Sequence, residues 1–329
     1  MSSGWQQRPE GGGRFAIWLI RSIARFGGRA ISRALLYPIT LYFVLVRGPE
    51  RRASRDFLGR VFGRRARLLE VARHIHCFSA TILDRVFLLS GQLRRFDMRV
   101  HGLKELHEVL DRQQGMLLFG SHHGSFEALR VLSLERPDIQ LRVVMDRHQN
   151  AAVTQLLEAL SPEIARTVID AQQDGIAITL AINEQTRANA VVALLVDRAK
   201  AGDAATVVPF LGAGAEFPNA PFLIAATLRV PVMLSFGLYR GGRRYDLHFE
   251  PFEVEYDVPR AQRRAALERM QARYAQRLEH YVRAAPYNWF NFYDFWSTDA
   301  SRNRSEAGGN AGGSVGNGAG GVDAGGAAA

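Results

Sequence analysis

The chain carries MLLFGSHHGSFE at residues 116–127, where an apolar run leads into a turn that holds two histidines, two serines and an acid. An uninterrupted apolar run of this length is typical of a strand buried on both faces. His122 follows that strand and precedes Glu127 by five positions. An imidazole that a carboxylate holds in one tautomer takes a proton from a hydroxyl group. The stretch therefore predicts a catalytic base at the end of a buried strand and indicates that an alcohol is activated.

From Phe96 onward, short β-like runs alternate with amphipathic windows. Strands are predicted at residues 98–101, 116–119, 141–145, 191–196, 206–210, 232–236 and 245–249. Helices are predicted at residues 103–112, 126–134, 151–160, 175–186, 220–228 and 260–282. This alternation, in a chain of 329 residues with 47% hydrophobic content, predicts a layered α/β domain with a full core.

The net charge of +10 is concentrated at one end of the chain. Residues 1–100 contain 19 Arg and no Lys against 6 acidic residues, whereas the rest of the chain is slightly acidic. The arginines flank apolar and aromatic segments, which suits an anionic membrane surface better than the groove of a nucleic acid. The pattern predicts membrane binding and argues against a nucleic-acid partner.

The apolar run Ala34–Val46 is uncharged but covers only 13 residues and includes Pro38. About 20 residues are needed to cross the hydrocarbon layer, so a longer helix would cross only if Arg33 and Arg47 reached opposite interfaces. We favour an anchor that lies on the membrane, with a single crossing as the alternative. Arginines interrupt the apolar sequence too often for a cleaved signal peptide, so the anchor is expected to stay attached.

Residues 56–90 have apolar side chains spaced by three and four, which predicts a helix whose polar face is almost wholly Arg. His74 and His76 point away from each other on such a helix, which favours packed or solvated histidines over a metal site. The single Cys77 excludes an intrachain disulfide and fits a reducing cytoplasm.

From Ala307 onward almost every residue is Gly, Ala, Ser or Asn, which predicts a disordered tail without a role in chemistry. The expected organisation is a membrane anchor at residues 1–55, one domain at 56–300 and the tail at 301–329.

Other chemistries fit the central motif less well. Adjacent histidines diverge, and the zinc-binding pattern His-Glu-x-x-His does not occur, which argues against a metal site. A serine hydrolase needs Gly-x-Ser-x-Gly, but the centre between Gly120 and Gly124 is His122. His123 lies four residues before Glu127 and is given a structural role.

Five blocks of the sequence follow one another in the order of a known enzyme family. They are His122–Glu127, Met145–Asn150, Leu194–Arg198, Val208–Gly212 with Phe217–Pro221, and Val230–Val232 with Gly237–Arg240. These blocks resemble the membrane-bound acyltransferases of lipid A biosynthesis, within the wider lysophospholipid acyltransferase group. The resemblance covers roughly residues 15–297. It implies a glycerol-phosphate-acyltransferase-like α/β fold with a mixed central sheet flanked by helices, preceded by a hydrophobic, Arg-rich helical anchor.

By this resemblance His122 is the general base that deprotonates an acceptor hydroxyl, and Glu127 orients and charges the ring. Attack on a thioester develops an oxyanion, and acceptors in the family carry phosphate, so positioned arginines are required. Arg147 is the first candidate for this binding, and Arg198 and Arg240 are second choices because each also suits a structural role.

Asp197 aligns with a family position that bears Asp and is expected to fix an arginine or the backbone near the site, with a loop or N-cap acid as the alternative. Phe217–Pro221 is expected to open a helix beside the acceptor or acyl site. The aromatic stretch Ala285–Trp296 is expected either to rest on lipid beside the site or to form a buried lid over the core.

The resemblance implies an acyltransferase at the cytoplasmic face of the bacterial inner membrane. Its acyl donor would be an acyl carrier protein or coenzyme A thioester, its acceptor a hydroxyl of a lipid or lipid-linked molecule, and it would use no metal or redox cofactor. The Arg-rich N-terminal segment would hold anionic lipid and attract an acidic carrier protein. The family's Tyr-Arg-Pro is Asp146-Arg147-His148 here, so the acceptor is left open. A glycerophospholipid acyltransferase that uses lysophosphatidic acid is the alternative, and a non-catalytic membrane-binding protein is the alternative of another class.

Overall fold

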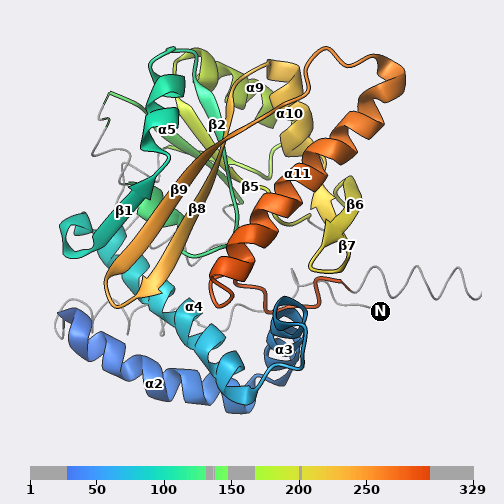
Figure 1. The fold of residues 1–329 in the computed structure, drawn as a ribbon. Helices are drawn as coiled ribbons and strands as arrows, with labels where there is room; N and C mark the ends of the chain where they lie inside the picture. The colour runs from blue at the N-terminus through green and yellow to red at the C-terminus, as the bar shows by residue number, and fades with distance from the viewer. Residues whose placement is uncertain (1–27, 131–135, 137, 147–166, 200–201, 297–329) are drawn as a thin grey trace, which may run out of the picture. The chain divides into compact units, whose positions relative to one another are not determined.

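The computed structural model describes residues 28–130, 136, 138–146, 167–199 and 202–296 (Figure 1). The helices are α2 (Gly28–Val46), α3 (Gly48–Phe62), α4 (Leu68–Leu89), α5 (Leu103–Leu110), α9 (Gly175–Arg187), α10 (Ala220–Leu228) and α11 (Arg263–Ala284), with 3-10 helices η2 (Leu93–Arg95), η3 (Phe126–Arg130) and η4 (Arg260–Gln262). The strands are β1 (Asp97–His101), β2 (Met116–Gly120), β3 (Leu141–Met145), β4 (Val168–Asp170), β5 (Val191–Leu195), β6 (Ala205–Phe210), β7 (Ala213–Pro218), β8 (Val232–Gly241) and β9 (Arg244–Phe252).

Seven of these strands form one mixed sheet in the order β1-β9-β8-β2-β5-β3-β4. Strands β8, β2, β5, β3 and β4 are mutually parallel, and the hairpin between β8 and β9 reverses the direction at one side. Strand β1 pairs in parallel with β9. The strands β6 and β7 form a separate antiparallel hairpin. The mixed α/β fold expected from the sequence is confirmed.

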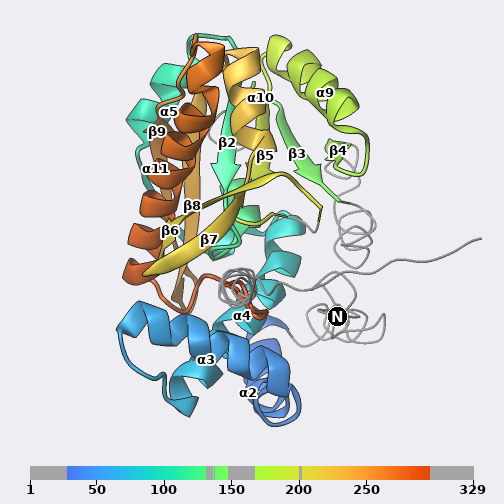
Figure 2. The same cartoon turned by 90° about the vertical axis from the view of Figure 1, so that its right-hand side faces the viewer.

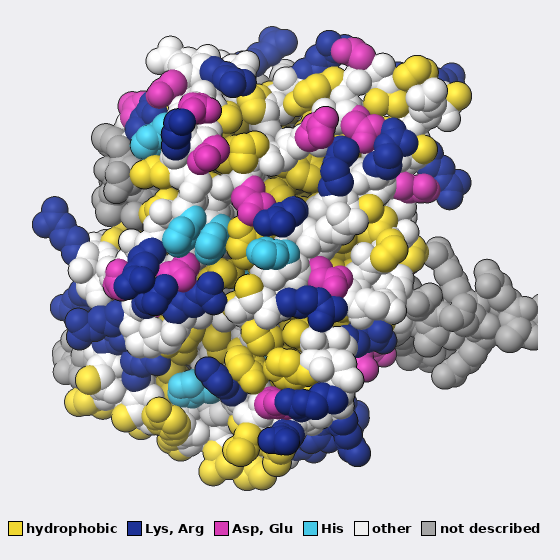
Figure 3. Space-filling model, in the orientation of Figure 1, with side chains coloured by type: hydrophobic (Ala, Val, Ile, Leu, Met, Phe, Trp, Pro, Cys, Tyr) yellow, Lys and Arg dark blue, Asp and Glu magenta, His cyan; other side chains and the backbone are white. Residues whose placement is uncertain are grey.

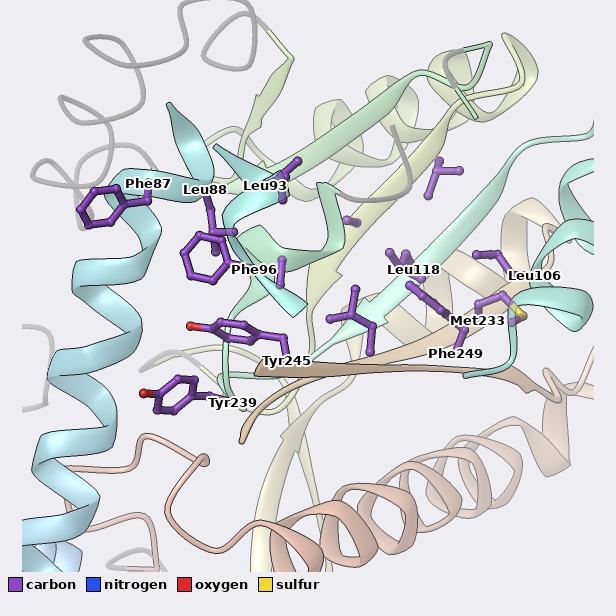
Figure 4. Packing of buried hydrophobic residues seen from close by; sticks show 14 of the residues in the cluster. Phe87, Leu88, Leu93, Phe96, Leu106, Leu118, Met233, Tyr239, Tyr245 and Phe249 are labelled. Atoms are coloured by element: carbon purple, nitrogen blue, oxygen red, sulfur yellow. The ribbon is translucent and has the colours of Figure 1, made fainter. Parts of the chain in front are cut away.

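The central strands β2, β5 and β8 are buried on both faces, which explains why they read as continuous apolar runs. On one face, α4, α5 and η3 cover β2, β5, β8 and β9, with Leu118 and Met233 inside the packed cluster (Figure 4). On the other face, the ring of Phe119 meets Phe222 of α10, which in turn packs on Tyr274 of α11. Successive residues of β2 thus point to opposite, equally buried faces.

The helices α2, α3 and α4 gather beyond the end of the sheet toward which β2 runs (Figures 1 and 2). The sequence predicted helical structure over residues 56–90, and two helices, α3 and α4, form there with a break that the pattern did not show. Gly63 ends α3 with φ +65°, a left-handed conformation that glycine adopts without strain. The side-chain carboxylate of Glu70 then accepts a hydrogen bond from the backbone N–H of Arg67, which fixes the first turn of α4. Apolar spacing continues across this break, which is why periodicity alone missed it.

Most predicted strands and helices of the α/β domain are confirmed, with three differences. Strands β4 and β7 were not predicted, because β4 has three residues and β7 begins Ala-Gly-Ala without large apolar side chains. Where a helix was predicted at 126–134, residues Phe126–Arg130 form a 3-10 helix. Residues 131–134, the helix predicted at 151–160 and the tail at 301–329 lie outside the described residues.

Candidate active site

His122 and Asp197 stand at equivalent positions on neighbouring parallel strands. Gly120, the last residue of β2, pairs in register with Leu195, the last residue of β5. The next residue of the second strand, Val196, still donates its N–H to the carbonyl of Gly120. His122 and Asp197 each lie two residues farther on, at the carboxyl ends where sites form in parallel sheets. The register alone therefore brings the imidazole and the carboxylate together.

The carboxylate of Asp197 holds His122 at two points. The ring Nδ1 of His122 lies 2.8 Å from Oδ1, and the backbone N–H of His122 donates to Oδ2 over 3.1 Å. Because a carboxylate only accepts, Nδ1 carries the hydrogen and Nε2 is left as the nitrogen that can take a proton. The His122 side chain is 40% exposed, whereas that of Asp197 is fully buried. The pair thus has the layout of a general base and its orienting acid.

Asp197 stays ionised in spite of its burial. Burial alone would raise the pKa of Asp197, but His122, Arg198 and the indole of Trp289 together hold it well below its usual range. The Trp289 Nε1–H donates to Oδ2 over 2.9 Å, and the Arg198 Nε lies 3.6 Å from the same oxygen. The pKa of His122 is lowered by desolvation first and then by the charge of Arg198, against the opposing effect of Asp197. The ring is therefore expected to be neutral, and able to act as a base, near pH 7.

Glu127, predicted to orient His122, is engaged elsewhere. Its Oε1 lies 2.5 Å from Nε of Arg85 on α4, and its Oε2 accepts the hydroxyl of Ser125 over 3.1 Å. The carboxylate on Nδ1 of His122 belongs to Asp197 instead. The physical reason is the direction of the chain after β2: the turn places Glu127 in η3, which packs on α4, whereas the strand register places Asp197 beside the ring. A catalytic role for Glu127 stays a prediction.

The turn that carries His122 depends on a close backbone approach at Gly124. Gly124 has φ +72°, and a Cβ there would lie 1.7 Å from the carbonyl oxygen of Gly237 on β8. Its N–H donates to the carbonyl of Asn288, and the N–H of Ser125 donates to that of Gly237, both over 2.8 Å. The turn is therefore fixed on two sides by backbone hydrogen bonds.

Gly124→Ala is expected to displace this turn, with a loss of unfolding free energy of about 3 kcal/mol or more. The matched control is Gly63→Ala, because Gly63 has a similar φ of +65° but, among the described residues, its Cβ would meet nothing within 4 Å. The unfolding free energy of the control should fall only by what the left-handed backbone costs an alanine, about 1 kcal/mol. Urea unfolding measures both variants, and equal losses would contradict the steric explanation.

The segment around Trp289 contacts both residues of the pair, which the sequence did not predict. The backbone N–H of Phe290 donates to the carbonyl of His122 over 3.0 Å, and Arg198 donates to the carbonyl of Phe290 over 2.5 Å. Trp289 is fully buried and bonds Asp197 through its indole. Of the two expectations for residues 285–296, the buried lid fits Trp289 and Phe290. The aromatic segment that follows α11 thus holds the strand-end pair in place.

Behind Trp289 lies the buried His74 of α4. Its Nε2 lies 3.0 Å from the carbonyl oxygen of Trp289, and its Nδ1 lies 2.8 Å from the hydroxyl of Ser54. Since a carbonyl only accepts, Nε2 donates and Ser54 donates to Nδ1. His74 is therefore a packed, neutral histidine, as the helical pattern predicted, and it supports the backbone of the aromatic segment.

Protonation of His74 predicts a loss of stability in acid. Burial lowers the pKa of His74 to about 4, against about 6.5 in an unfolded chain. As pH falls from 6.5 to 4 the unfolded chain binds this proton first, so the free energy of unfolding decreases across that window, by up to about 3 kcal/mol. His74→Gln keeps polar groups without titrating, and its urea midpoint should vary less with pH than that of the wild type. Identical pH dependence in the two proteins would show that His74 is not responsible.

Arg240 lies in a separate ion-pair cluster. Its Nε donates to Asp246 over 2.8 Å, and Arg244 donates to the same carboxylate over 3.0 and 3.1 Å. His101 and His248 lie beside Asp246, and one possible ligand atom from each of the three residues lies within 4.8 Å of the other two. The guanidinium groups of Arg240 and Arg244 both bind Asp246, which is the one carboxylate of this three-residue group, and their charges would repel a metal ion. The cluster is therefore explained as a set of ion pairs. The other candidate, Arg147, lies outside the described residues.

Comparison with known proteins shows the family to which the chain belongs. The sequence model of the family described as bacterial lipid A biosynthesis acyltransferase matches residues 83–298, and the search of curated proteins found no match. The matched segment contains the whole central sheet, His122, Asp197 and Trp289, and it begins inside α4. Because it covers about two thirds of the chain, the chain belongs to the bacterial lipid A biosynthesis acyltransferase family and is an acyltransferase.

Proposed function

We propose that the chain moves an acyl group from a thioester to a hydroxyl of a lipid or lipid-linked acceptor, with His122 as the general base. The observation that carries this proposal is the Nδ1 contact of His122 with the buried, ionised Asp197, which leaves Nε2 to accept a proton. The attacking oxygen belongs to the acceptor, because the residue at the centre of the turn is the base itself.

The reaction needs one proton to move twice. Nε2 of His122 takes the hydroxyl proton of the acceptor while its oxygen attacks the thioester carbonyl, and Asp197 stabilises the imidazolium that forms. When the tetrahedral intermediate collapses, the carbon–sulfur bond breaks and His122 returns the proton to the leaving thiolate. The ester and the free thiol are the products, and the enzyme regains its starting state.

Two arginines beside His122 are candidates for binding negative charge. Arg198 lies 3.6 Å from Asp197, and Arg85 pairs with Glu127, and the charges of both arginines lower the pKa of His122. A cation near His122 would also stabilise an oxyanion or an acceptor phosphate. We assign Glu127 the role of holding Arg85 in place. Arg147 remains a candidate for binding the oxyanion or the acceptor phosphate. Arg240 is a weaker candidate because Asp246 already engages it.

We assign the protein to the cytoplasmic face of the inner membrane, where thioester donors and lipid acceptors meet. Among the described residues, the helix at Arg29–Val46 is long and apolar enough to cross a membrane by length and composition. The donor is proposed to be an acyl carrier protein or coenzyme A thioester, attracted by the excess of N-terminal arginines.

The test is a lipid mass spectrum of reactions with each donor. Purified protein is incubated with acyl-carrier-protein or acyl-coenzyme A thioesters and with extracted bacterial lipids or lysophosphatidic acid. A new acylated lipid from the extract, with one donor preferred, supports the proposal and identifies both substrates. Acylation of lysophosphatidic acid alone would establish the glycerophospholipid alternative, and no product with any donor, from folded protein, would contradict the proposed acceptor and donor classes.

A further inference from the structure

Strand β8 continues past the end of β2, where a side chain takes over the pairing on that side. The pairing of β2 with β8 ends at Phe119 and Leu234, whereas β8 runs on to Gly241. The Oδ1 of Asn288 accepts the N–H of Tyr239 over 2.7 Å, and its Nδ2 donates to the carbonyl of the same residue over 3.1 Å. A side-chain amide thus takes the place of a peptide group in the sheet.

The backbone of Asn288 ties the turn of His122 to this point of the sheet. Its carbonyl accepts the N–H of Gly124 over 2.8 Å, and its own N–H donates over 3.0 Å to the carbonyl of Ala285, directly after α11. Asn288 is buried, and all four of its polar groups are hydrogen-bonded. The next residue, Trp289, therefore starts from a backbone position that the sheet fixes.

The indole of Trp289 is packed so that its N–H points at one oxygen of Asp197. The rings of Phe57, Phe210 and Phe295 stand edge-on to the indole, with ring centroids 5.0 to 5.2 Å away. The side chain is fully buried, and its N–H donates to Oδ2 of Asp197 over 2.9 Å. Rotation of the indole would need space that the three neighbouring rings occupy.

The two oxygens of Asp197 serve different groups. Oδ1 faces Nδ1 of His122 at 2.8 Å, whereas Oδ2 accepts the indole N–H over 2.9 Å and the backbone N–H of His122 over 3.1 Å. On the face shown in Figure 3, surface carboxylates lie beside basic side chains, and water there replaces a lost donor. Asp197 is fully buried, so each donor on Oδ2 withdraws charge that would otherwise act on the His122 ring.

We propose that Trp289 is a positioning residue for acyl transfer, and that its N–H limits how strongly Asp197 holds a proton on His122. Asn288 acts with it by fastening the segment to β8. The indole does this without touching a substrate, since it is fully buried. With the N–H in place, the imidazolium that forms in the reaction gives its proton to the leaving thiolate more readily. The inference rests on His122 as the base in the proposed function.

Other charged and titratable groups also face the pair, and a substitution at position 289 alters none of them. Burial lowers the pKa of His122, the charges of Arg198 and Arg85 lower it further, and Asp197 raises it. Removal of the indole N–H leaves more charge on Asp197, so the pKa of His122 should rise and the ring should stay protonated to higher pH. The groups that face the pair are Arg198 after β5, Arg85 of α4, Glu127 of η3, His123, Tyr274 of α11 and Tyr293.

Replacement of Trp289 by 3-benzothienylalanine, in which sulfur stands where the indole has its N–H, tests the inference. The ring system keeps its size, so its packing and the exclusion of water are kept. Trp289→Phe is made beside it, also in the full chain. Phe57→Leu is the matched control, because it removes a ring that packs on the same indole at 5.1 Å but leaves the N–H on Asp197.

Two readouts are taken from the same preparations. Diethyl pyrocarbonate modifies neutral imidazole, and mass spectrometry of the modified peptide gives the midpoint pH of the reaction at His122 without any substrate. The His122 side chain is 40% exposed and open to the reagent, whereas His123 is buried. Thioester consumption in the presence of extracted lipid then gives kcat and KM as functions of pH.

Both replacements at position 289 should raise the midpoint of His122 by about half a pH unit or more. The acid limb of kcat/KM should move to higher pH by the same amount, with KM nearly unchanged. Asn288→Ala should shift the midpoint in the same direction, because it releases the segment that carries the indole.

The control Phe57→Leu should keep the wild-type midpoint even where its urea midpoint falls. An unchanged or lower midpoint in the benzothienylalanine protein, or an equal shift in Phe57→Leu, would overturn the inference. An unchanged midpoint in Asn288→Ala would contradict its part in holding the indole. A protein that shows the expected midpoints but consumes no thioester would instead contradict the proposed function, so the two failures are distinguished.

Discussion

His122→Ala is expected to reduce the rate of acyl transfer by about 10²–10⁴-fold while the fold is kept. Without the imidazole, no group at this position removes the acceptor proton or returns it to the thiolate. The substitution should cost little stability, because the side chain is 40% exposed. The rate is measured as donor consumed per folded enzyme, with circular dichroism to verify the fold.

Two controls make the His122 result specific. His280→Ala removes an exposed histidine of α11 and should leave the rate unchanged. Added imidazole should restore part of the activity of His122→Ala, since the vacated position is open to solvent, but should not affect the wild type. A variant as active as the wild type would contradict the assignment of His122 as the base.

The kcat of Asp197→Asn is expected to fall by about 10²–10⁴-fold. The fall in kcat of Glu127→Gln is expected to be at least tenfold smaller. Asn presents either an amide oxygen or an amide NH₂ to a site that offers three N–H donors, so it neither fixes the His122 tautomer nor stabilises the imidazolium. Glu127 instead touches Arg85 and Ser125, so its loss should raise KM more than it lowers kcat.

The comparison between the two carboxylates decides which one serves His122. Both variants are made with neutral amides of the same size, and kcat is referred to folded protein because Asp197 is fully buried. A larger loss of kcat in Glu127→Gln than in Asp197→Asn would restore the pairing that the five-residue spacing predicted.

Much of the fold was visible in the sequence because its central strands are buried on both faces. The runs at 116–119 and 191–196 are apolar without alternation, which is what burial between two helical layers requires. The short β4 and the Gly-Ala start of β7 carry no such signal. Their pairing depends on neighbouring strands, which local patterns do not report.

The candidate site was predictable only in part. His122 stood out because a histidine directly follows a buried strand, but its partner was sought nearby in sequence, at Glu127. The contact with Asp197 depends on the register of β2 with β5, two strands that are 75 residues apart at this pair. A comparison of the residues two positions past each predicted parallel strand would have found it.

No sequence signal linked Trp289 or His74 to His122 and Asp197. Trp289 belongs to the segment after α11, and His74 belongs to α4, before β1. They meet through a hydrogen bond between residues 215 positions apart. An aromatic cluster and a lone histidine are common core features, and spacing alone does not connect them to the site.

A single-turnover reaction with an isotopically labelled acyl thioester tests the central claim most directly. Excess protein and extracted lipid are mixed with the donor, and mass spectrometry follows the label on donor, protein and lipid, for wild type and His122→Ala. The account predicts that the wild type moves the label to lipid without acylated protein, and that the variant leaves it on the donor. Label on the wild-type protein before it reaches lipid, or equal labelling of lipid by the variant, would contradict direct transfer with His122 as the base.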